Sequence, residues 1–330
     1  MFKTKSMIKA SHDRKVLVII GNGFDLDLEL KTSYKDFMLS QIFDDYRENS
    51  HLEISSYGKL NLFDYLQDRF DGNDKKWIDV EIELREFAKN IDLTEYNNKQ
   101  EPIEYIEKSF NQVRDALCEY LTNIDYTSIN IQSAAIELLK SIRRSGNCMV
   151  YNFNYTDLNR LNAYIGGAPS FTIHNIHGNL KDRSIILGFE SIPLNYTDLD
   201  FMIKYQSDSY KTSEKTDIRK DIGEAEEILI FGHTLGCTDH SYFQGFFQRE
   251  VNPNKSKQIP ISIVTFDAKS RRIINREINY MTNNEAEVLN INYIQTHGNT
   301  SQGDIHMFFN KLEARITPIH IPTNQRIFIY

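Results

Sequence analysis

The feature that most constrains this fold is the apolar run Lys15-Val16-Leu17-Val18-Ile19-Ile20, which leads directly into Gly21-Asn22-Gly23. An unbroken, β-branched run of this length is typical of a strand buried on both faces, as in a parallel sheet. A helical pattern then opens at Ser33, with Asp36 three positions on, which is the spacing of a capped helix start. A buried strand, a glycine turn and a helix in this order predict an α/β sheet.

Helical periodicity fills the chain from about residue 40 to 145, and strand-like runs return after it. We predict the later strands at 148–153, 171–173, 185–187, 228–231, 261–264 and 288–291. Short strands separated mostly by helix-length segments imply right-handed βαβ crossovers. We therefore expect a three-layer, Rossmann-like α/β fold with a parallel sheet. Residues 15–330 would form a single domain, with a large helical insertion at about 40–145.

Composition narrows the class of protein. The 330 residues carry 38 Lys+Arg against 46 Asp+Glu, and this net charge of −8 argues against a globally cationic nucleic-acid binder. The three cysteines stand far apart with no C-x-x-C pair, which fits a reducing compartment and excludes a four-thiolate zinc site. Residues 1–14 form a basic arm without the apolar stretch of a secretory signal, and no apolar run approaches the ~18 residues of a membrane span. We expect a cytoplasmic protein that does not enter a membrane.

Glycine and polar residues follow the first predicted strand, at the edge where parallel sheets bind ligands. They are Gly21, Asn22, Gly23, Phe24 and Asp25. Glycines here let backbone N–H groups approach a phosphate or ribose, but tight packing of a strand against a helix explains them equally well. The dinucleotide signature G-x-G-x-x-G is incomplete because Leu26 replaces the third glycine, which disfavours an ordinary dehydrogenase.

Two further groups follow later strands. Asn152, Asn154 and Tyr155 come at the end of one strand, where an Asn can hold a ribose hydroxyl or a water, or can cap the following helix. His177 and Gly178 follow the next strand. A His at a strand end can act as a base near neutral pH, with the small neighbour leaving room for substrate. Taken singly, a structural histidine is the commoner case.

The last candidates follow the strands at 228–231 and 261–264. They are Gly232, His233, Thr234, Asp239 and Asp267. A carboxylate at a strand end can accept from ribose hydroxyls or can cap the next helix.

A metal site is not expected. Asp79, Glu81 and Glu83 are close in sequence, but their two-residue spacing does not place them on one helix face. Glu81 could line the pocket from its helix face, but we expect it to be solvated.

A family resemblance rests on several of these segments taken together. The segments are Ile20 to Leu26, Thr32 to Phe37, Asn152 to Thr156, Ile176 to Gly178, and Gly232 to Leu235 with Asp239. In this order they resemble the AbiH-like family of bacterial phage abortive-infection proteins. The resemblance spans about residues 15 to 310 and implies a role in antiphage defence.

The same order also resembles a remote version of the sirtuin fold, in which such segments line an NAD site with a catalytic Asn and His. That resemblance implies catalytic roles for Asn154 and His177. It places Gly21 and Gly23, and Ser33, Asp36 and Phe37 of the next helix, near the nucleotide. The zinc-bearing cysteine module of sirtuin deacetylases is absent, so the resemblance favours NAD-consuming defence proteins over deacetylases.

These resemblances lead to one hypothesis and one alternative. The hypothesis is an antiphage toxin that hydrolyses NAD to nicotinamide and ADP-ribose and requires no cofactor or metal. His177 would act as the base, Asn154 would hold the ribose or the water, and backbone amides of the glycine turn would cradle the pyrophosphate. Asp239 or Asp267 would accept from the adenosine ribose. The alternative is a nucleotide-sensing module that controls assembly or a partner effector without turnover.

Control of such a toxin implies partners. We expect a homo-oligomer, with a phage-derived trigger or a partner protein as further possibilities. The apolar run at 319–330 has the pattern of a strand that needs pairing, inside its own sheet or with another protomer.

Overall fold

The computed structural model describes residues 15–51, 57–76, 78–143, 148–167, 170–190, 197–204, 218–255, 257–297 and 301–316. The expected basic arm at 1–14 and the apolar run at 319–330 lie outside these residues.

Six parallel strands form one sheet in the order β3-β2-β1-β4-β5-β6. Their bounds are β1 Val16–Ile20, β2 Cys148–Asn152, β3 Thr172–Asn175, β4 Glu227–Phe231, β5 Ile261–Thr265 and β6 Ile291–Gln295. The order reverses between β1 and β4, so the segments that leave these two neighbouring strands diverge. In doubly wound sheets this reversal is where a ligand crevice opens.

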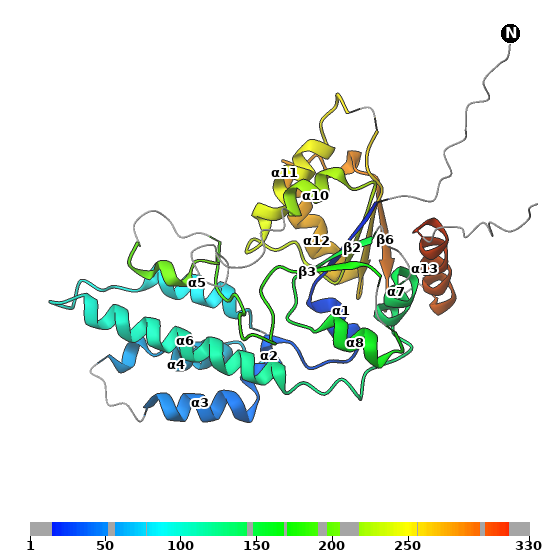
Figure 1. Cartoon of the computed structure of the whole chain (residues 1–330). Coiled ribbons are helices and arrows are strands. Elements are labelled where there is room, and N and C mark those ends of the chain that lie inside the picture. Colours follow the sequence, from blue (N-terminus) through cyan, green and yellow to red (C-terminus); the bar gives the residue numbers. More distant parts are fainter. Residues whose placement is uncertain are drawn as a thin grey trace, which may run out of the picture.

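Helices surround the sheet (Figure 1). Before β2 they are α1 Asn22–Asp27, α2 Tyr34–Met38, α3 Gln41–His51, η1 Gly58–Leu60, α4 Leu62–Gly72, α5 Val80–Asn90, α6 Gln100–Thr122 and α7 Ala134–Ile142. After β2 they are α8 Leu158–Tyr164, η2 Thr197–Met202, α10 Ile218–Glu224, α11 His240–Glu250, α12 Ala268–Met281, η4 Ala286–Val288 and α13 Gln302–Ile316. The expected three-layer α/β fold with a helical insertion between the first two strands is confirmed.

The central strand β1 is buried on both faces, as its sequence predicts. Val16, Val18 and Ile20 pack in a core with α1, α7, α8 and α13. Leu17 and Ile19 point to the opposite face and pack in a second core with α10, α11 and α12. Because successive side chains of a strand alternate, an all-apolar strand requires helices on both sides.

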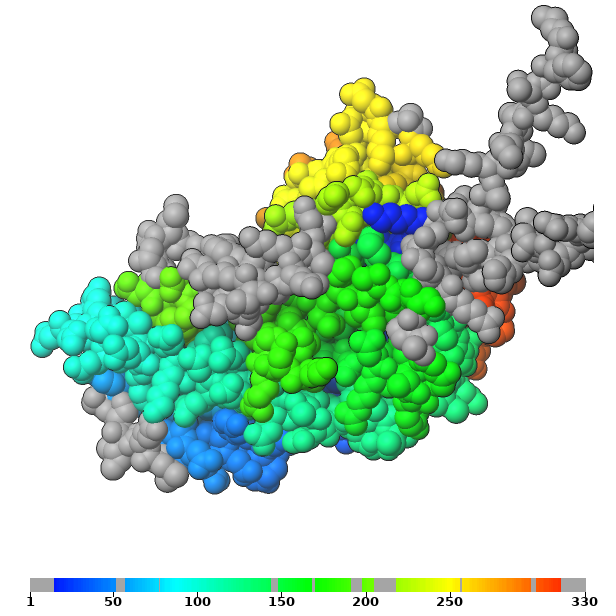
Figure 2. Space-filling model, in the orientation of Figure 1, coloured from blue at the N-terminus to red at the C-terminus, as the bar shows by residue number. Residues whose placement is uncertain are grey.

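The insertion forms a helical block with a core of its own, made by α2 to α6 together with buried residues near 185–189 and 199–203. Figure 1 shows this block projecting from the sheet, and Figure 2 shows it, blue to cyan, as one end of the molecule. Ser33 and Asp36 cap the start of α2 reciprocally, as predicted, and Asp79 caps α5. The block meets the sheet along the edge where the strands end.

Two of the strand predictions are wrong in detail. Residues 185–187 are buried as expected but form a loop, whose apolar side chains Ile185 and Leu187 pack into the core of the helical block. The predicted strand at 288–291 begins later, because η4 occupies Ala286–Val288 and β6 pairs with β5 from Ile291 to Gln295. An apolar run in the sequence predicts that a segment is buried. Whether the segment forms a strand depends on hydrogen bonding to a neighbouring strand.

Candidate active site

A cavity of about 680 Å³ lies at the carboxyl edge of the sheet, around the reversal between β1 and β4. Segments that follow β1, β2, β4 and β5 line it from the sheet side, and α5 and α6 line it from the helical block. Its size is that of a pocket for a small molecule. The strand-end rule that guided the choice of candidate residues therefore leads to one enclosed site.

Close backbone packing explains the glycines of the first turn. A Cβ at Gly21 would lie 2.4 Å from His233 Cα, and one at Gly23 would lie 2.6 Å from Gly232 Cα. The N–H groups of Gly21 and Gly23 donate to the carbonyl oxygens of Phe231 and Gly232 at 3.0 and 2.9 Å. The N–H groups of Gly21 and Gly23 are therefore used between the β1 and β4 turns, so any cradle for a pyrophosphate falls to the other amides of the glycine turn.

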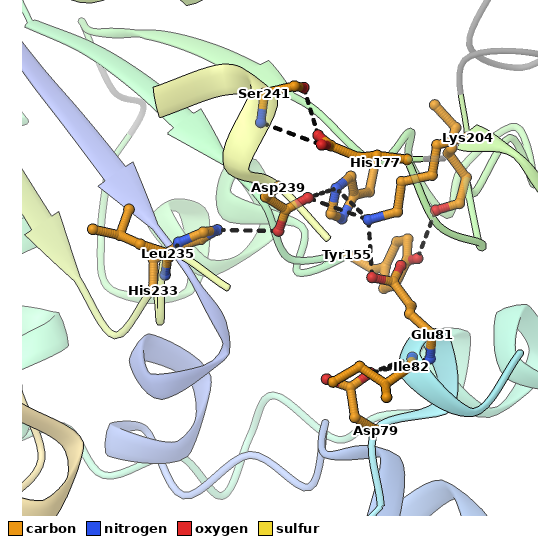
Figure 3. Close-up of polar contacts among 12 residues, drawn as sticks. Asp79, Glu81, Ile82, Tyr155, His177, Lys204, His233, Leu235, Asp239 and Ser241 are labelled. Atoms are coloured by element: carbon orange, nitrogen blue, oxygen red, sulfur yellow. Dashed lines mark hydrogen bonds and ion pairs between the residues drawn. The ribbon is translucent and has the colours of Figure 1, made fainter. Parts of the chain in front are cut away.

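A buried network of charged and polar side chains lies on one wall of the cavity (Figure 3). Lys204 Nζ lies 2.9 Å from Glu81 Oε2 and 3.2 Å from Asp239 Oδ1. The same Asp239 oxygen lies 3.2 Å from His177 Nε2. The other oxygen, Oδ2, faces His233 Nε2 at 3.5 Å, and His233 Nδ1 accepts from the N–H of Leu235. One lysine thus links two carboxylates and two histidines across the boundary between sheet and helical block.

Local structure positions each member of this network. Asp239 occupies the N-cap position of α11 but makes no capping bond, so its carboxylate is free for the two histidines and Lys204. His177 is fixed by its carbonyl, which accepts from Ile186 N at 2.8 Å, and by the edge of the Phe153 ring. Glu81 lies in the first turn of α5. Because Asp239 makes no capping hydrogen bond to α11, its carboxylate has a role other than stabilising the start of that helix.

Burial and charge set the protonation of the network. Burial opposes the charge on Asp239, but Lys204 and His177 more than compensate and hold its pKa well below the usual range. Burial and the Lys204 cation lower the pKa of His177, so its imidazole is neutral near pH 7. Burial raises the pKa of Glu81 to about 8, with Lys204 opposing and Asp239 and Asp79 adding to the rise. Asp239 and Lys204 are therefore the charged pair, and Glu81 readily holds a proton.

A second polar group lies across the cavity. Asp25 Oδ2 accepts from the Thr156 hydroxyl, while Asp25 Oδ1 and Asn154 Nδ2 are buried without a hydrogen-bond partner among the described residues. Burial raises the pKa of Asp25 to about 6. Asn152, directly beneath, donates to Thr156 O and accepts from Asn154 N, so it shapes the turn that presents Asn154. Unpartnered polar atoms facing a cavity are suited to hold a ligand.

A family model described as bacteriophage abortive infection AbiH matches residues 17–262. The chain belongs to this family. No curated protein and no solved structure matches it. The matched range includes β1 to β4 and every residue of the Lys204 network, so the AbiH family region supplies most of the cavity.

Most of the residues proposed from the sequence line the cavity of this AbiH-family chain. They are Gly21, Asn22, Gly23, Asp25, Asn154, Tyr155, His177, Gly232, His233, Thr234 and Asp239. The proposed catalytic pair, Asn154 and His177, is thus brought to the same cavity from the ends of β2 and β3.

Other proposed residues lie away from the cavity lining. Ser33 and Asp36 bond to one another in the cap of α2, and Phe37 is in the core of the helical block. Asp267 caps α12 by accepting from Ser270 N at 2.7 Å, which is the capping role left open by the sequence. None of these four residues lines the cavity.

Phe24, Asn152 and Gly178 support the site from behind. Phe24 packs edge-on against Phe231 in the core, and Asn152 is fully buried. Gly178 has a φ of +77°, and a Cβ there would lie 1.9 Å from Ser184 O. The small residue after His177 therefore makes room for the loop at Ser184, which corrects the expectation that it makes room for substrate.

Sequence reasoning missed several cavity residues of the AbiH-family chain. Glu81 was expected to be solvated but is only 6% exposed and lines the cavity, and Asp79 and Tyr34 line it too. Lys204 follows η2, where no strand end or glycine turn marks it. The periodicity of a helix shows which of its faces is apolar, but not which part of the chain packs against that face. The only local signal near Glu81 is Asp79, whose residue type suits the N-cap of α5.

The charge of the lining limits the chemistry. Among the described residues that line the cavity there are four carboxylates, Asp25, Asp79, Glu81 and Asp239, and no Lys or Arg. No group of three or more His, Cys, Asp or Glu in the described part of the chain is arranged to hold a metal ion. No described helix has the length and apolar character needed to cross a membrane. The cavity is an acidic site equipped with imidazoles.

Proposed function

We propose that this protein of the abortive-infection family acts on phage-infected cells by hydrolysing the N-ribosyl bond of NAD or a related nucleotide. The observation that carries the proposal is the neutral His177, held by Asp239 in an acidic cavity that also contains Asn154. A site of this kind suits a reaction in which positive charge develops on the substrate.

Cleavage of the ribose–nicotinamide bond has that character. The electron pair of the C1′–N bond moves to the nicotinamide ring, which leaves as a neutral molecule, and positive charge grows on the ribose. A water oxygen then bonds to C1′ and loses a proton to a base. The ionised Asp239 and the other carboxyl groups of the lining, which ionise more readily as positive charge approaches, favour the charge that develops, and no metal is required in this scheme.

Named residues supply the remaining parts. His177 Nε2 lies 3.2 Å from Asp239 Oδ1 and 3.3 Å from Lys204 Nζ. A neutral imidazole has one donor and one acceptor nitrogen, so in the tautomer that donates from Nε2 to Asp239 it is Nδ1 that accepts the proton of the water. Asn154 Nδ2, buried and without a partner among the described residues, would orient the ribose or the water. Asp239 orients His177 and stabilises its protonated form.

The decisive test is incubation of purified protein with NAD, followed by chromatographic separation of nicotinamide and ADP-ribose. Replacement of the base, His177→Ala, should lower nicotinamide release by ~10²–10⁴-fold. His174→Ala is a matched control, because His174 lies on β3 three residues earlier and outside the cavity lining. It should leave turnover within a few fold of wild type.

Two results would contradict the proposal in different ways. Folded His177→Ala protein that releases nicotinamide within about twofold of wild type removes His177 from the mechanism. Wild-type protein that binds NAD but releases no nicotinamide favours the nucleotide-sensing module over the hydrolase.

A further inference from the structure

We propose that Glu81 determines the specificity of the cavity by selecting a ligand ring that carries a positive charge over the same ring in neutral form. For nicotinamide nucleotides this means binding of oxidised NAD in preference to reduced NADH. The inference rests on the proposed function for its choice of ligand, and it concerns binding rather than turnover.

The position of Glu81 is the first argument. Its Oε2 accepts from Lys204 Nζ at 2.9 Å, while Oε1 is buried with no hydrogen-bond partner among the described residues. The residue is 6% exposed and lines the cavity, on the same wall as His177. Figure 3 shows Lys204 reaching between Glu81 and the Asp239–His177 pair. One carboxyl oxygen of a cavity-lining residue is therefore left without a partner among the described residues, on the same Lys204 network as the proposed base.

The balance of charge is the second argument. The groups that bear on Glu81 are Lys204 after η2, Asp239 at the start of α11, Asp79 on its own turn, Tyr34 of α2 and Tyr155 after β2. Of these, Lys204 alone is a cation, and it is shared with Asp239. With both carboxylates ionised this group carries a net negative charge in a water-poor site, which is costly unless a cation approaches.

Protonation links this charge to ligand choice. Burial raises the pKa of Glu81 to about 8, so without a ligand it holds a proton near pH 7. A cationic ring would favour the ionised form and lower this pKa, whereas a neutral ring would not. Binding of the cation should therefore release a proton and strengthen as the pH rises through about 8.

Titration calorimetry of the full-length protein with NAD and with NADH, at about pH 7 and about pH 9, tests the inference. We expect wild type to bind NAD at least ~10-fold more tightly than NADH, with the ratio growing at the higher pH and with proton release on NAD binding. Glu81→Gln, which keeps an acceptor for Lys204, should lose most of the ratio and its pH dependence. Glu86→Gln is the control, because Glu86 is on the same helix with a 36% exposed side chain and lies outside the cavity lining.

Each result decides the matter. Equal binding of NAD and NADH by wild type, or an unchanged ratio in folded Glu81→Gln, overturns the inference. If Glu81→Gln does not fold, the pH dependence of the wild-type ratio decides, and a flat profile overturns the inference. NAD binding with the expected preference but no nicotinamide release supports the inference and rejects only the hydrolase proposal. Failure to bind either nucleotide rejects both.

Discussion

Asp25 is a residue that costs this fold stability. Its side chain is 1% exposed, one of its oxygens has no partner among the described residues, and burial raises its pKa from 3.8 to about 6 despite the hydrogen bond from the Thr156 hydroxyl. A raised carboxyl pKa means that the native state disfavours the charge. A buried carboxyl group with a raised pKa in a cavity lining is a candidate functional residue, and Asp25 lines the cavity.

The first prediction follows from this pKa. Because the native state binds the Asp25 proton more tightly than the unfolded chain does, its contribution to the free energy of unfolding falls as the pH rises from about 4 to about 6. Asp25→Asn should therefore match wild type near pH 4 and exceed it by up to about 3 kcal/mol above pH 6. Chemical denaturation across this pH range measures the difference.

Asp267→Asn is the matched control for Asp25. The pKa of Asp267 is lowered because it accepts from Ser270 N, so its contribution is present above its unfolded pKa and is lost as the pH falls. The two variants should change stability near pH 7 in opposite directions. A loss of stability in Asp25→Asn at that pH would contradict the assignment of Asp25 as a destabilising buried charge.

The second prediction separates Asn152 from Asn154, which the sequence could not do because residues two positions apart share a face wherever the chain is a strand. Asn152→Ala leaves the buried Thr156 carbonyl and Asn154 N–H without their partner, and should lower the free energy of unfolding by about 2–3 kcal/mol. Asn154→Ala should change stability by less than ~1 kcal/mol but lower nicotinamide release by ~10²-fold or more. Melting curves and product chromatography distinguish the two. A stable, fully active Asn154→Ala would remove it from the site.

At the scale of elements, the turns after β1 and β4 act as one unit. Gly232 has a φ of +65°, and a Cβ there would lie 2.3 Å from Phe24 N. The turn also places His233 next to Phe153, with ring centroids 4.5 Å apart. The two glycine turns therefore set the spacing of the sheet edge that forms the cavity.

The third prediction tests that unit. Gly232→Ala combines an unfavourable φ with contact against backbone, and should lower the free energy of unfolding by about 3 kcal/mol or more. Gly236→Ala is the control in the same segment, because its Cβ would meet only the Thr234 hydroxyl at 3.3 Å. It should cost less than ~1 kcal/mol. Equal stability of the two variants, measured by denaturation, would show that the close approach of the turns is not required.

Helices and strands are predicted well from the sequence where a local residue pattern is compatible with only one structure. An all-apolar strand before a glycine turn, as in β1, is such a case, and so is the Ser33–Asp36 cap. The run at 185–187 is not, because its side chains are buried against the helical block without any strand to pair with. Local sequence shows that a segment is buried, but the partner that covers it is chosen by the rest of the chain.

At the scale of the whole molecule, three hydrophobic cores meet around the cavity, one on each face of the sheet and one in the helical block. The strand-end residues could be predicted to form a site because the strands were expected to be parallel. The contribution of the helical block could not, because Glu81 reaches the cavity wall, and Lys204 reaches Glu81, only through tertiary packing. The sequence around Glu81 and the sequence around Lys204 give no sign that these two side chains contact each other.

The last prediction concerns assembly. An enzyme that consumed NAD without restraint would harm its own cell, so we expect its activity to be coupled to self-association, as a homo-oligomer, or to a trigger or partner protein. The apolar residues of 319–322 and 327–330 have a strand pattern suited to pairing, and β3 and β6 are the edges of the described sheet. Light scattering and nicotinamide release should rise together with protein concentration. Removal of residues 319–330 should weaken both, while removal of the basic arm at 1–14 should weaken neither. A protein that is monomeric at every concentration and fully active would contradict this coupling.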